Sequence, residues 1–119
     1  MLLYEGKAKK VFKYTDDTVM MFFKDDATAG NRAKEAVFDG KGKLNASISA
    51  KLFEHLHTFG IATHFIKTNG EYEHECYKLD IIPIEVIVRN RAAGTFCKRY
   101  GVEVGTALKN VVVEWCVKD

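Results

Sequence analysis

The sequence lacks the features that mark several large classes of protein. Its three cysteines, Cys76, Cys97 and Cys116, form no CxxC motif and no Cys/His spacing of the kind found in zinc sites. This pattern argues against both a disulfide framework and a zinc site. No apolar run approaches the roughly 20 residues of a transmembrane helix, and residues 1–3 are too short for a signal-peptide core. We therefore expect reduced thiols, a cytoplasmic protein and no membrane partner.

Net charge and proline are also scarce. A net charge of +2 is too small to indicate a polyanionic partner, so any function of the cations must be local. The one proline, Pro83, lacks the N–H group of a central strand and is expected at the beginning or edge of a strand. The 119 residues are 47% hydrophobic and 29% charged, with no repeat or linker, which is typical of about one globular domain.

Residues 84–101, IEVIVRNRAAGTFCKRYG, are the most informative stretch. An apolar, β-branched run opens it and predicts a buried strand. Cations follow without any acid, and the small residues 92–94 leave room for a ligand to approach the backbone. The planar groups of Arg89 and Arg91 can each hold a phosphate or carboxylate by two hydrogen bonds, and Gly94 and Thr95 can open a short helix toward it.

An alternative without a binding function is that the chain leaves the core at this point and the arginines are solvated, since surface arginines are common. Strand alternation favours the binding site, because it puts Arg89 on the same face as Ile87 and Glu85.

The amino-terminal part predicts a small antiparallel sheet. Residues 4–12 and 19–23 have strand character, and the polar residues 15–18 supply a turn between them. The first segment contains EGKAKKVF, in which Gly6 permits close approach and Lys7 or Lys9 can neutralise phosphate, as in a flap over a nucleotide. It lacks the GxxxxGK[ST] pattern of a P-loop, and such lysines also occur as plain solvated protectors of an edge strand.

The middle of the chain predicts a helix and a hairpin. Leu44, Ile48, Leu52, Leu56 and Phe59 recur at helical spacing, so we expect this stripe to face the core, with Gly60 at the end of the helix. His55 and His57 lie two residues apart on the helix and cannot face one metal together. Asn-Gly at 69–70 predicts a tight hairpin, and residues 111–117 have the character of a strand. Residues 24–31 have a composition suited to a ligand loop, and a plain connecting loop is equally consistent.

The order of these segments resembles the phosphoribosylaminoimidazole-succinocarboxamide synthase (SAICAR synthetase) family of purine biosynthesis. The resemblance runs from Leu3 to Asp119, and PxEVxVRNxAAGxxxKRxG is its most specific part. It implies an α+β fold, in which a twisted antiparallel sheet with one packed helix, similar to the N-terminal lobe of a kinase, leads into the start of a second sheet domain. Residues 1–80 would form the ATP-binding lobe, and residues 81–119 would begin the central substrate- and ATP-binding domain.

The resemblance also implies a reaction and its site residues. Members of the family use ATP and Mg²⁺ to activate carboxyaminoimidazole ribonucleotide (CAIR), through an acyl phosphate, for attack by L-aspartate. The implied phosphate-binding residues for the substrate are Arg89 and Thr95, where Thr95 stands in place of the usual serine. The residues implied for ATP are Gly6, Lys7, Ala8 and Lys9 in the flap, and Asp80, Ile81 and Ile82 in a hinge against adenine.

Family members are about twice as long as this chain, so we expect the Mg²⁺ ligands in the missing half, with none in this chain, and no activity from this chain alone. The catalytic and aspartate-binding residues are unassigned, and a homo-oligomer is left open. Two other classes also remain open. A non-catalytic nucleotide- or phosphate-binding module would have the same anion site, whereas an RNA-binding domain is less consistent, because Phe96 and Tyr100 are as easily core residues as stacking platforms.

Overall fold

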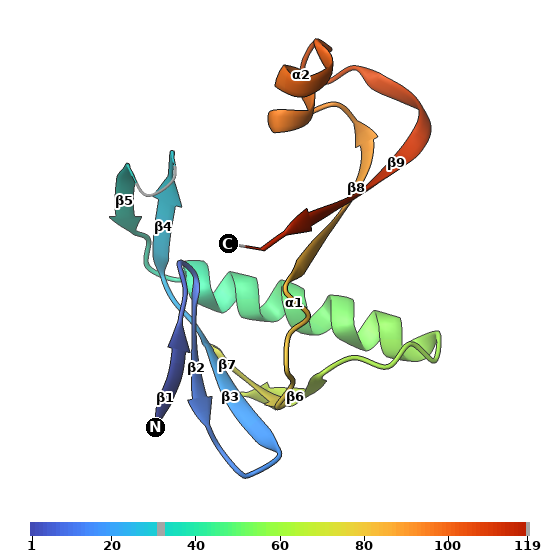
Figure 1. The fold of residues 1–119 in the computed structure, drawn as a ribbon. Coiled ribbons are helices and arrows are strands. Elements are labelled where there is room, and N and C mark those ends of the chain that lie inside the picture. The colour runs from blue at the N-terminus through green and yellow to red at the C-terminus, as the bar shows by residue number, and fades with distance from the viewer. Residues whose placement is uncertain (31–32, 119) are drawn as a thin grey trace. The chain divides into compact units, whose positions relative to one another are not determined.

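The computed structural model describes residues 1–30 and 33–118 (Figure 1). The chain divides into two compact units, Met1–Leu79 and Asp80–Asp119. None of the described helices is both long and apolar enough to cross a membrane. The elements of the first unit are β1 (Leu2–Glu5), β2 (Lys9–Lys13), β3 (Thr18–Phe23), β4 (Asp26–Ala29), β5 (Lys34–Val37), α1 (Lys41–Thr58), β6 (Phe65–Asn69) and β7 (Glu73–Tyr77). Those of the second are β8 (Ile84–Arg91), α2 (Thr95–Tyr100) and β9 (Ala107–Val117).

The first unit is built on an antiparallel sheet with the strand order β1-β2-β3-β7-β6. The hydroxyls of Thr15 and Thr18 lie 2.6 Å apart in the predicted turn between β2 and β3. Gly70 has a φ of 71°, as the tight turn between β6 and β7 requires. Helix α1 crosses this sheet and contacts β3, β6 and β7 (Figure 1). The predicted fold class, α+β with antiparallel sheets and one main helix, is confirmed.

Helix α1 buries its small residues and not its large ones, so the predicted core stripe is wrong. Gly42, Ala46 and Ala50 are buried. In contrast, Leu44, Ile48 and Leu52 are 67%, 57% and 61% exposed. A Cβ atom at Gly42 would lie 2.2 Å from the carbonyl oxygen of Phe23. At its first turn the helix backbone therefore lies too close to β3 for a side chain to fit between them.

The centre of the first unit is an aromatic cluster around His74. The His74 ring lies 4.6 Å from the ring of Phe23 and 5.0 Å from that of Phe65, between centroids. Its Nε2 atom donates to the carbonyl oxygen of Ala46 at 2.8 Å. Burial lowers the pKa of His74 below its usual value. The neutral ring thus ties α1 to the sheet.

Residues 24–30 form structure in place of most of the predicted ligand loop. The carboxylate of Asp25 accepts from the backbone N–H of Gly42 at 2.8 Å, at the first turn of α1. Strand β4 follows at once and pairs with β5. Asn31, the last residue of that prediction, lies outside the described residues. Asp25 therefore has a structural role at the helix N-terminus.

The second unit is a ribbon of β8 and β9 with the short helix α2 between them. Its small core consists of Ala92, Phe96 and Cys97, with Val102, Leu108 and Val112 packed against them. Strand β8 was predicted to be buried, and this is wrong, because Ile84, Val86 and Val88 are all exposed. Among the described residues β8 pairs only with β9.

All three cysteines are free thiols, as expected. Cys76 and Cys97 are buried, and Cys116 is partly buried. Burial raises the pKa of the Cys76 thiol to about 11, so this side chain is a neutral core residue at physiological pH.

Candidate functional site

The turn between β1 and β2 carries the predicted ATP flap. It is closed by a hydrogen bond of 2.8 Å from the N–H of Gly6 to the carbonyl oxygen of Lys9. Lys7 is exposed at this turn. Lys9 is exposed as well, and its ammonium group lies 5.2 Å from the ring centroid of Phe23. Both lysines can thus be reached from solvent, and the contact of Lys9 with an aromatic ring leaves Lys7 as the freer of the two to meet a ligand.

Gly6 and Lys7 line a cavity of about 120 Å³. The ammonium group of Lys24 lies in it, 2.8 Å from Oε2 of Glu5 and 3.3 Å from Oδ2 of Asp26. The hydrogen bond from Lys24 lowers the pKa of Glu5, and the hydrogen bond to Glu5 raises the pKa of Lys24. The complete lining is Glu5, Gly6, Lys7, Lys24, Asp26, Thr28 and Glu35.

The charges that line this cavity decide whether it can bind an anion. The carboxylates of Glu5, Asp26 and Glu35 outnumber the ammonium groups of Lys7 and Lys24, so a bare phosphate would meet repulsion inside. Only the edge at Lys7 favours an anion. Within residues 1–30 and 33–118 no three His, Cys, Asp or Glu side chains gather closely enough to hold a metal ion.

Sequence reasoning did not assign Lys24, Asp26, Thr28 or Glu35 to this site. The composition of residues 24–31 indicated a ligand loop, but nothing in the sequence pointed to Glu35. Glu35 joins the cavity because β5 pairs with β4, in the register Thr28↔Glu35.

The predicted adenine hinge, Asp80 to Ile82, has no regular secondary structure in the second unit. Ile81 and Ile82 are exposed, and the N–H of Ile84 donates to the carbonyl oxygen of Ile82 at 2.7 Å. The exposed side chains give an apolar surface of the kind that packs against a flat ring. Its role at adenine stays a prediction.

Arg89 lies beside the start of α2, so the structure brings the two predicted phosphate residues into one neighbourhood. Its Nε donates to Oε2 of Glu114 at 2.7 Å and its Nη1 donates to the carbonyl oxygen of Ala93 at 3.0 Å. The guanidinium carbon also lies 5.5 Å from the ring centroid of Phe96. Thr95 follows Ala93 by two residues and is exposed.

Glu114 and Arg99 are residues that sequence reasoning left out of this site. Glu114 lies in β9, and its Oε1 accepts from Nη1 of Arg99 at 3.0 Å. One carboxylate therefore orients two guanidinium groups. The sequence feature that could have indicated Glu114 is that it is the one acid in the otherwise apolar segment 111–117. Arg91 donates instead to the carbonyl oxygen of Gly105 at 2.9 Å, so the expected pair of Arg89 and Arg91 is divided between different partners.

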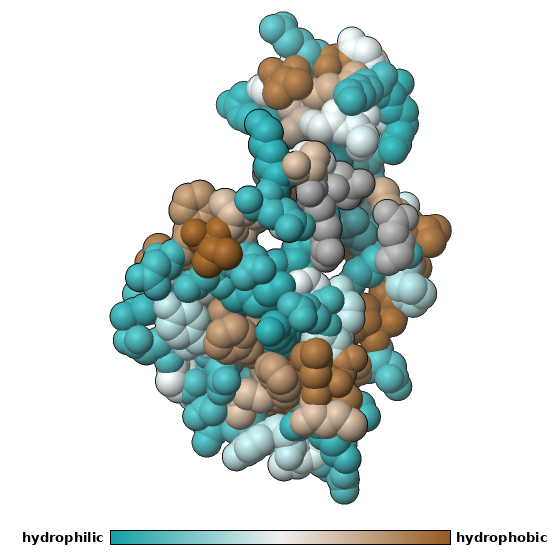
Figure 2. Space-filling model, turned by 90° about the vertical axis from the view of Figure 1, so that its left-hand side faces the viewer, coloured by the Kyte–Doolittle hydropathy of each residue, from teal (hydrophilic) through white to brown (hydrophobic). Residues whose placement is uncertain are grey.

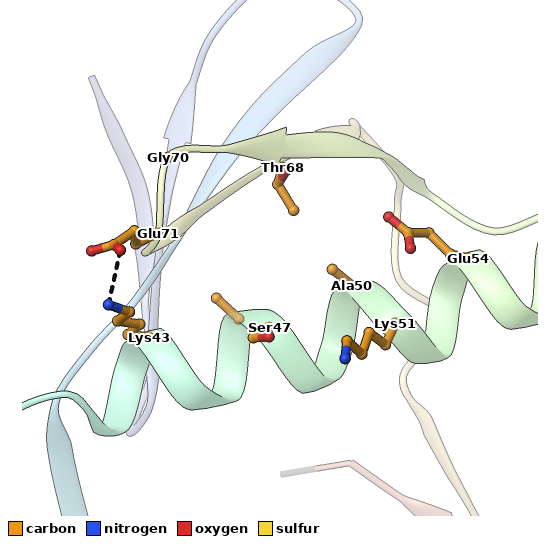
Figure 3. A pocket seen from close by; sticks show the side chains of 9 residues that line it. Lys43, Ser47, Ala50, Lys51, Glu54, Thr68, Gly70 and Glu71 are labelled. Atoms are coloured by element: carbon orange, nitrogen blue, oxygen red, sulfur yellow. Dashed lines mark ion pairs between the residues drawn. The ribbon is translucent and has the colours of Figure 1, made fainter.

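A larger cavity of about 340 Å³ lies between α1 and the β6–β7 hairpin. An ion pair of 2.8 Å between Lys43 and Glu71 spans one end of it, and Ser47 and Ala50 project from the helix (Figure 3). None of the predicted site residues line it.

Comparison with known proteins gives one consistent family. The model of the SAICAR synthetase family matches residues 2–119. The chain is 51% identical over 119 residues to a phosphoribosylaminoimidazole-succinocarboxamide synthase of Clostridium novyi, and 48% identical to that of Bacillus subtilis. These matches cover 99% of this chain but only 51% and 49% of the relatives.

Comparison with solved structures gives the same family as comparison of the sequences. One described as SAICAR synthetase (Type-2) in complex with ADP superposes on all of this chain with a TM-score of 0.94 and 45% identity. The enzyme from Ehrlichia chaffeensis superposes with a TM-score of 0.94 and 42% identity. This chain covers 51% of each of those chains, so it spans about half the length of the relatives that it matches.

Proposed function

This chain belongs to the SAICAR synthetase family, and we propose that it supplies the nucleotide-binding half of an ATP-dependent ligase that joins L-aspartate to CAIR. The observation that carries the proposal is the match over residues 2–119, which includes the whole IEVIVRNRAAGTFCKRYG segment. The relative in complex with ADP supports the use of an adenine nucleotide. The cytoplasmic location and any homo-oligomer stay predictions.

The proposed reaction has two steps. A carboxylate oxygen of CAIR attacks the γ-phosphorus of ATP, and ADP leaves with the electrons of the broken P–O bond. The amine of L-aspartate then attacks the acyl carbon, phosphate leaves, and the nitrogen gives up a proton as the amide forms. The products are SAICAR, ADP and phosphate. A phosphoryl transfer followed by an acyl transfer thus replaces one difficult direct condensation.

We assign the flap Gly6, Lys7, Ala8 and Lys9 to the phosphates of ATP. The exposure of Lys7 supports its part in this, because its ammonium group can move onto a phosphate without losing a buried partner. Lys9 contributes mainly by holding the flap to the Phe23 ring. Asp80, Ile81 and Ile82 are assigned to adenine, with the two isoleucines packing on the ring.

We assign Arg89 and Thr95 to the 5′-phosphate of CAIR. Arg89 is oriented through Nε by Glu114 and through Nη1 by Ala93, which leaves the Nη2 side of its fork to meet a phosphate oxygen. Thr95 offers a hydroxyl donor at the exposed start of α2.

Mg²⁺ is assigned to the half that this chain does not span. The described residues of this chain contain no group of three metal-ligating side chains, so they do not fit a Mg²⁺ site by themselves. No step of the proposed reaction is therefore derived through the ion here.

A reconstitution assay tests the proposal against the non-catalytic module. ADP formation that depends on both CAIR and L-aspartate is measured for this chain, for the C-terminal half of the Clostridium novyi relative, and for the two together. Turnover is expected only in the mixture. A module without catalysis would bind ATP and give no product in any arm. Product from this chain alone would mean that the catalytic acids lie within it.

A further inference from the structure

Arg99 is the second guanidinium group at the carboxylate of Glu114, and the proposed function has not yet given it a role. Oε2 of Glu114 accepts from Nε of Arg89 at 2.7 Å, and Oε1 accepts from Nη1 of Arg99 at 3.0 Å. Arg89 and Glu114 are partly buried, whereas the side chain of Arg99 is 53% exposed. Of these three side chains, Arg99 is therefore the one that a dissolved ligand reaches most easily.

Arg99 also shares a face of α2 with Thr95. The two residues are four positions apart, and side chains at that spacing are neighbours on a helix surface. Long side chains of a helix are directed toward its N-terminal end, so Arg99 is directed back toward the turn that Thr95 opens. The surface at the level of α2, at the top of Figure 2, mixes hydrophilic with hydrophobic residues, and both Thr95 and Arg99 are exposed. Arg99 thus lies beside the two residues already assigned to a phosphate.

The charge around Glu114 suits a phosphate only if Arg99 is included. A phosphate monoester carries a charge of about −1.5 to −2 at neutral pH. Glu114 offsets the charge of Arg89, so these two side chains alone would present no net charge to such an anion. With Arg99 the cluster has a positive surplus, and the shared carboxylate holds two like-charged groups near each other before any ligand binds.

Neighbouring cations have other placements. Nη1 of Arg91 donates to the carbonyl oxygen of Gly105 at 2.9 Å, which ties Arg91 to the turn before β9. Lys98 is exposed on α2, but the carboxylate of Glu114 accepts from Arg99 instead. Arg99 is thus the cation of α2 that Glu114 links to Arg89.

We propose that Arg99 is a third phosphate-binding residue, which contacts the 5′-phosphate of CAIR together with Arg89 and Thr95. Its Nη1 stays on Glu114, and its remaining donors bind phosphate oxygens. The identity of the nucleotide rests on the proposed function. The chemistry that this site recognises is a phosphate monoester on a ribose, because two guanidinium groups and a hydroxyl are donors for phosphate oxygens.

Binding of ribose 5-phosphate to this chain tests the proposal, because all three phosphate-binding residues lie in it. Spectra of the ¹⁵N-labelled chain follow the titration at low salt, where charges are least screened, and ribose without phosphate is the control ligand. We expect ribose 5-phosphate to bind and ribose not to bind. Arg99→Gln should weaken binding roughly tenfold, because it removes charge-assisted hydrogen bonds. Arg99→Lys should restore part of the affinity, since lysine keeps the charge without the planar group.

Lys98→Gln is the matched control for Arg99→Gln. It removes the same charge from an exposed position of the same helix, so it should change the affinity by less than about twofold. Circular dichroism verifies that each variant keeps the parent's secondary structure. A ³¹P titration adds a second measurement. The second pKa of the phosphate, about 6 in a free ester, should be lowered on binding to the parent and lowered less on binding to Arg99→Gln, an effect that a structural role of Arg99 would not produce.

Three results would overturn the inference. Equal weakening by Lys98→Gln and Arg99→Gln would mean that only the overall charge of α2 matters. An unchanged affinity in Arg99→Gln, with binding lost in Arg89→Gln, would exclude Arg99 and leave the assignment of Arg89 intact. If the parent binds ribose 5-phosphate no more tightly than ribose, the assignment of Arg89 fails together with that of Arg99. None of these titrations requires turnover, so an inactive reconstituted ligase would contradict the proposed reaction alone.

Discussion

Nε of Arg89 donates to Oε2 of Glu114 across 2.7 Å, on the partly buried face of the β8–β9 ribbon. The same carboxylate accepts from Arg99, and the side chains of Arg89 and Glu114 are only 14% and 12% exposed. An ion pair shielded to this degree holds its geometry better than one in open solvent. Glu114 thus sets the direction in which Arg89 presents its remaining donors.

Replacing Arg89 by lysine tests the phosphate assignment. Lysine keeps the charge but cannot bond Glu114, Ala93 and a phosphate at the same time. In the complete ligase, this chain together with the C-terminal half, we expect CAIR to bind roughly ten- to hundredfold more weakly, since a charge-assisted hydrogen bond is worth about 1.5–3 kcal/mol. ATP binding should be unchanged in the same calorimetric titrations.

A CAIR analogue without the 5′-phosphate is the control for Arg89→Lys. If the analogue is weakened as much as CAIR, the role of Arg89 is structural. Thr95→Ala should weaken CAIR binding less than Arg89→Lys does, because it removes one uncharged donor. Thr95→Ser should leave CAIR binding nearly unchanged.

Glu114→Ala should lower both stability and CAIR affinity. It leaves the guanidinium of Arg89 without its carboxylate in a partly buried position, at an expected cost of about 1–3 kcal/mol in the free energy of unfolding. Urea denaturation measures this cost, with Glu103→Ala, at an exposed glutamate of the same unit, as the control. An unchanged CAIR affinity in a folded Glu114→Ala variant would mean that Arg89 needs no orientation.

Lys7→Ala should weaken ATP binding and leave thermal stability nearly unchanged. Lys7 is exposed at the β1–β2 turn, so its loss removes no packing. Lys13→Ala is the matched control, because Lys13 ends β2 and pairs with Asp16 at 3.1 Å, at the opposite end of the strand from the flap. Equal ATP affinities of the Lys7→Ala variant and the parent protein would make Lys7 a plain edge-strand residue.

Gly42→Ala should destabilise the protein, although alanine is the better helix former by about 1 kcal/mol. The new Cβ atom would lie 2.2 Å from the Phe23 carbonyl oxygen and 2.9 Å from that of Lys24, and backbone atoms cannot move aside easily. We expect a loss of about 1–3 kcal/mol, as for other overpacked cores. Ser47→Ala, at an exposed position of α1, should be neutral or slightly stabilising in the same thermal melts. A stabilised Gly42→Ala variant would contradict the close approach of α1 to β3.

Stability should fall as the pH drops below about 6.5. Burial lowers the pKa of His74 from its usual value of 6.5. Just below pH 6.5 this histidine is therefore protonated in the unfolded chain but still neutral in the folded chain. The stabilising contribution is complete above pH 6.5 and is lost as the pH falls toward the lowered folded-state pKa. Burial lowers the pKa of His64 in the same direction.

A variant separates the contribution of His74. His74→Gln keeps an N–H donor for the Ala46 carbonyl and removes the titration, so its free energy of unfolding should depend less on pH between 5 and 7. Urea denaturation across that range measures the slope, with His55→Gln at an exposed position of α1 as the control. An unaltered slope in His74→Gln would assign the pH dependence to other groups.

Local chemistry in the sequence determined several turns and the facing of one strand, although the turn that divides residues 4–12 into β1 and β2 was not predicted. Asn69 and Gly70 specified the β6–β7 hairpin, the threonines at 15 and 18 specified the β2–β3 turn, and alternation put Arg89 on the face of Ile87. These features depend on neighbours in the chain, so residue type and period suffice to predict them. The order of the motifs likewise determined the family.

Only the tertiary structure decided which faces are covered and which distant residues meet. Hydrophobicity favoured Leu44 and Ile48 for the core, but they are exposed, and at Gly42 the approach of α1 to β3 leaves no room for a side chain. Glu114 reaches Arg89 from 25 positions away because β9 pairs with β8 in one register, and Glu35 reaches the cavity beside Lys7 through β4. Backbone separation and strand register arise from the packing of whole elements, and no local pattern of residues encodes them.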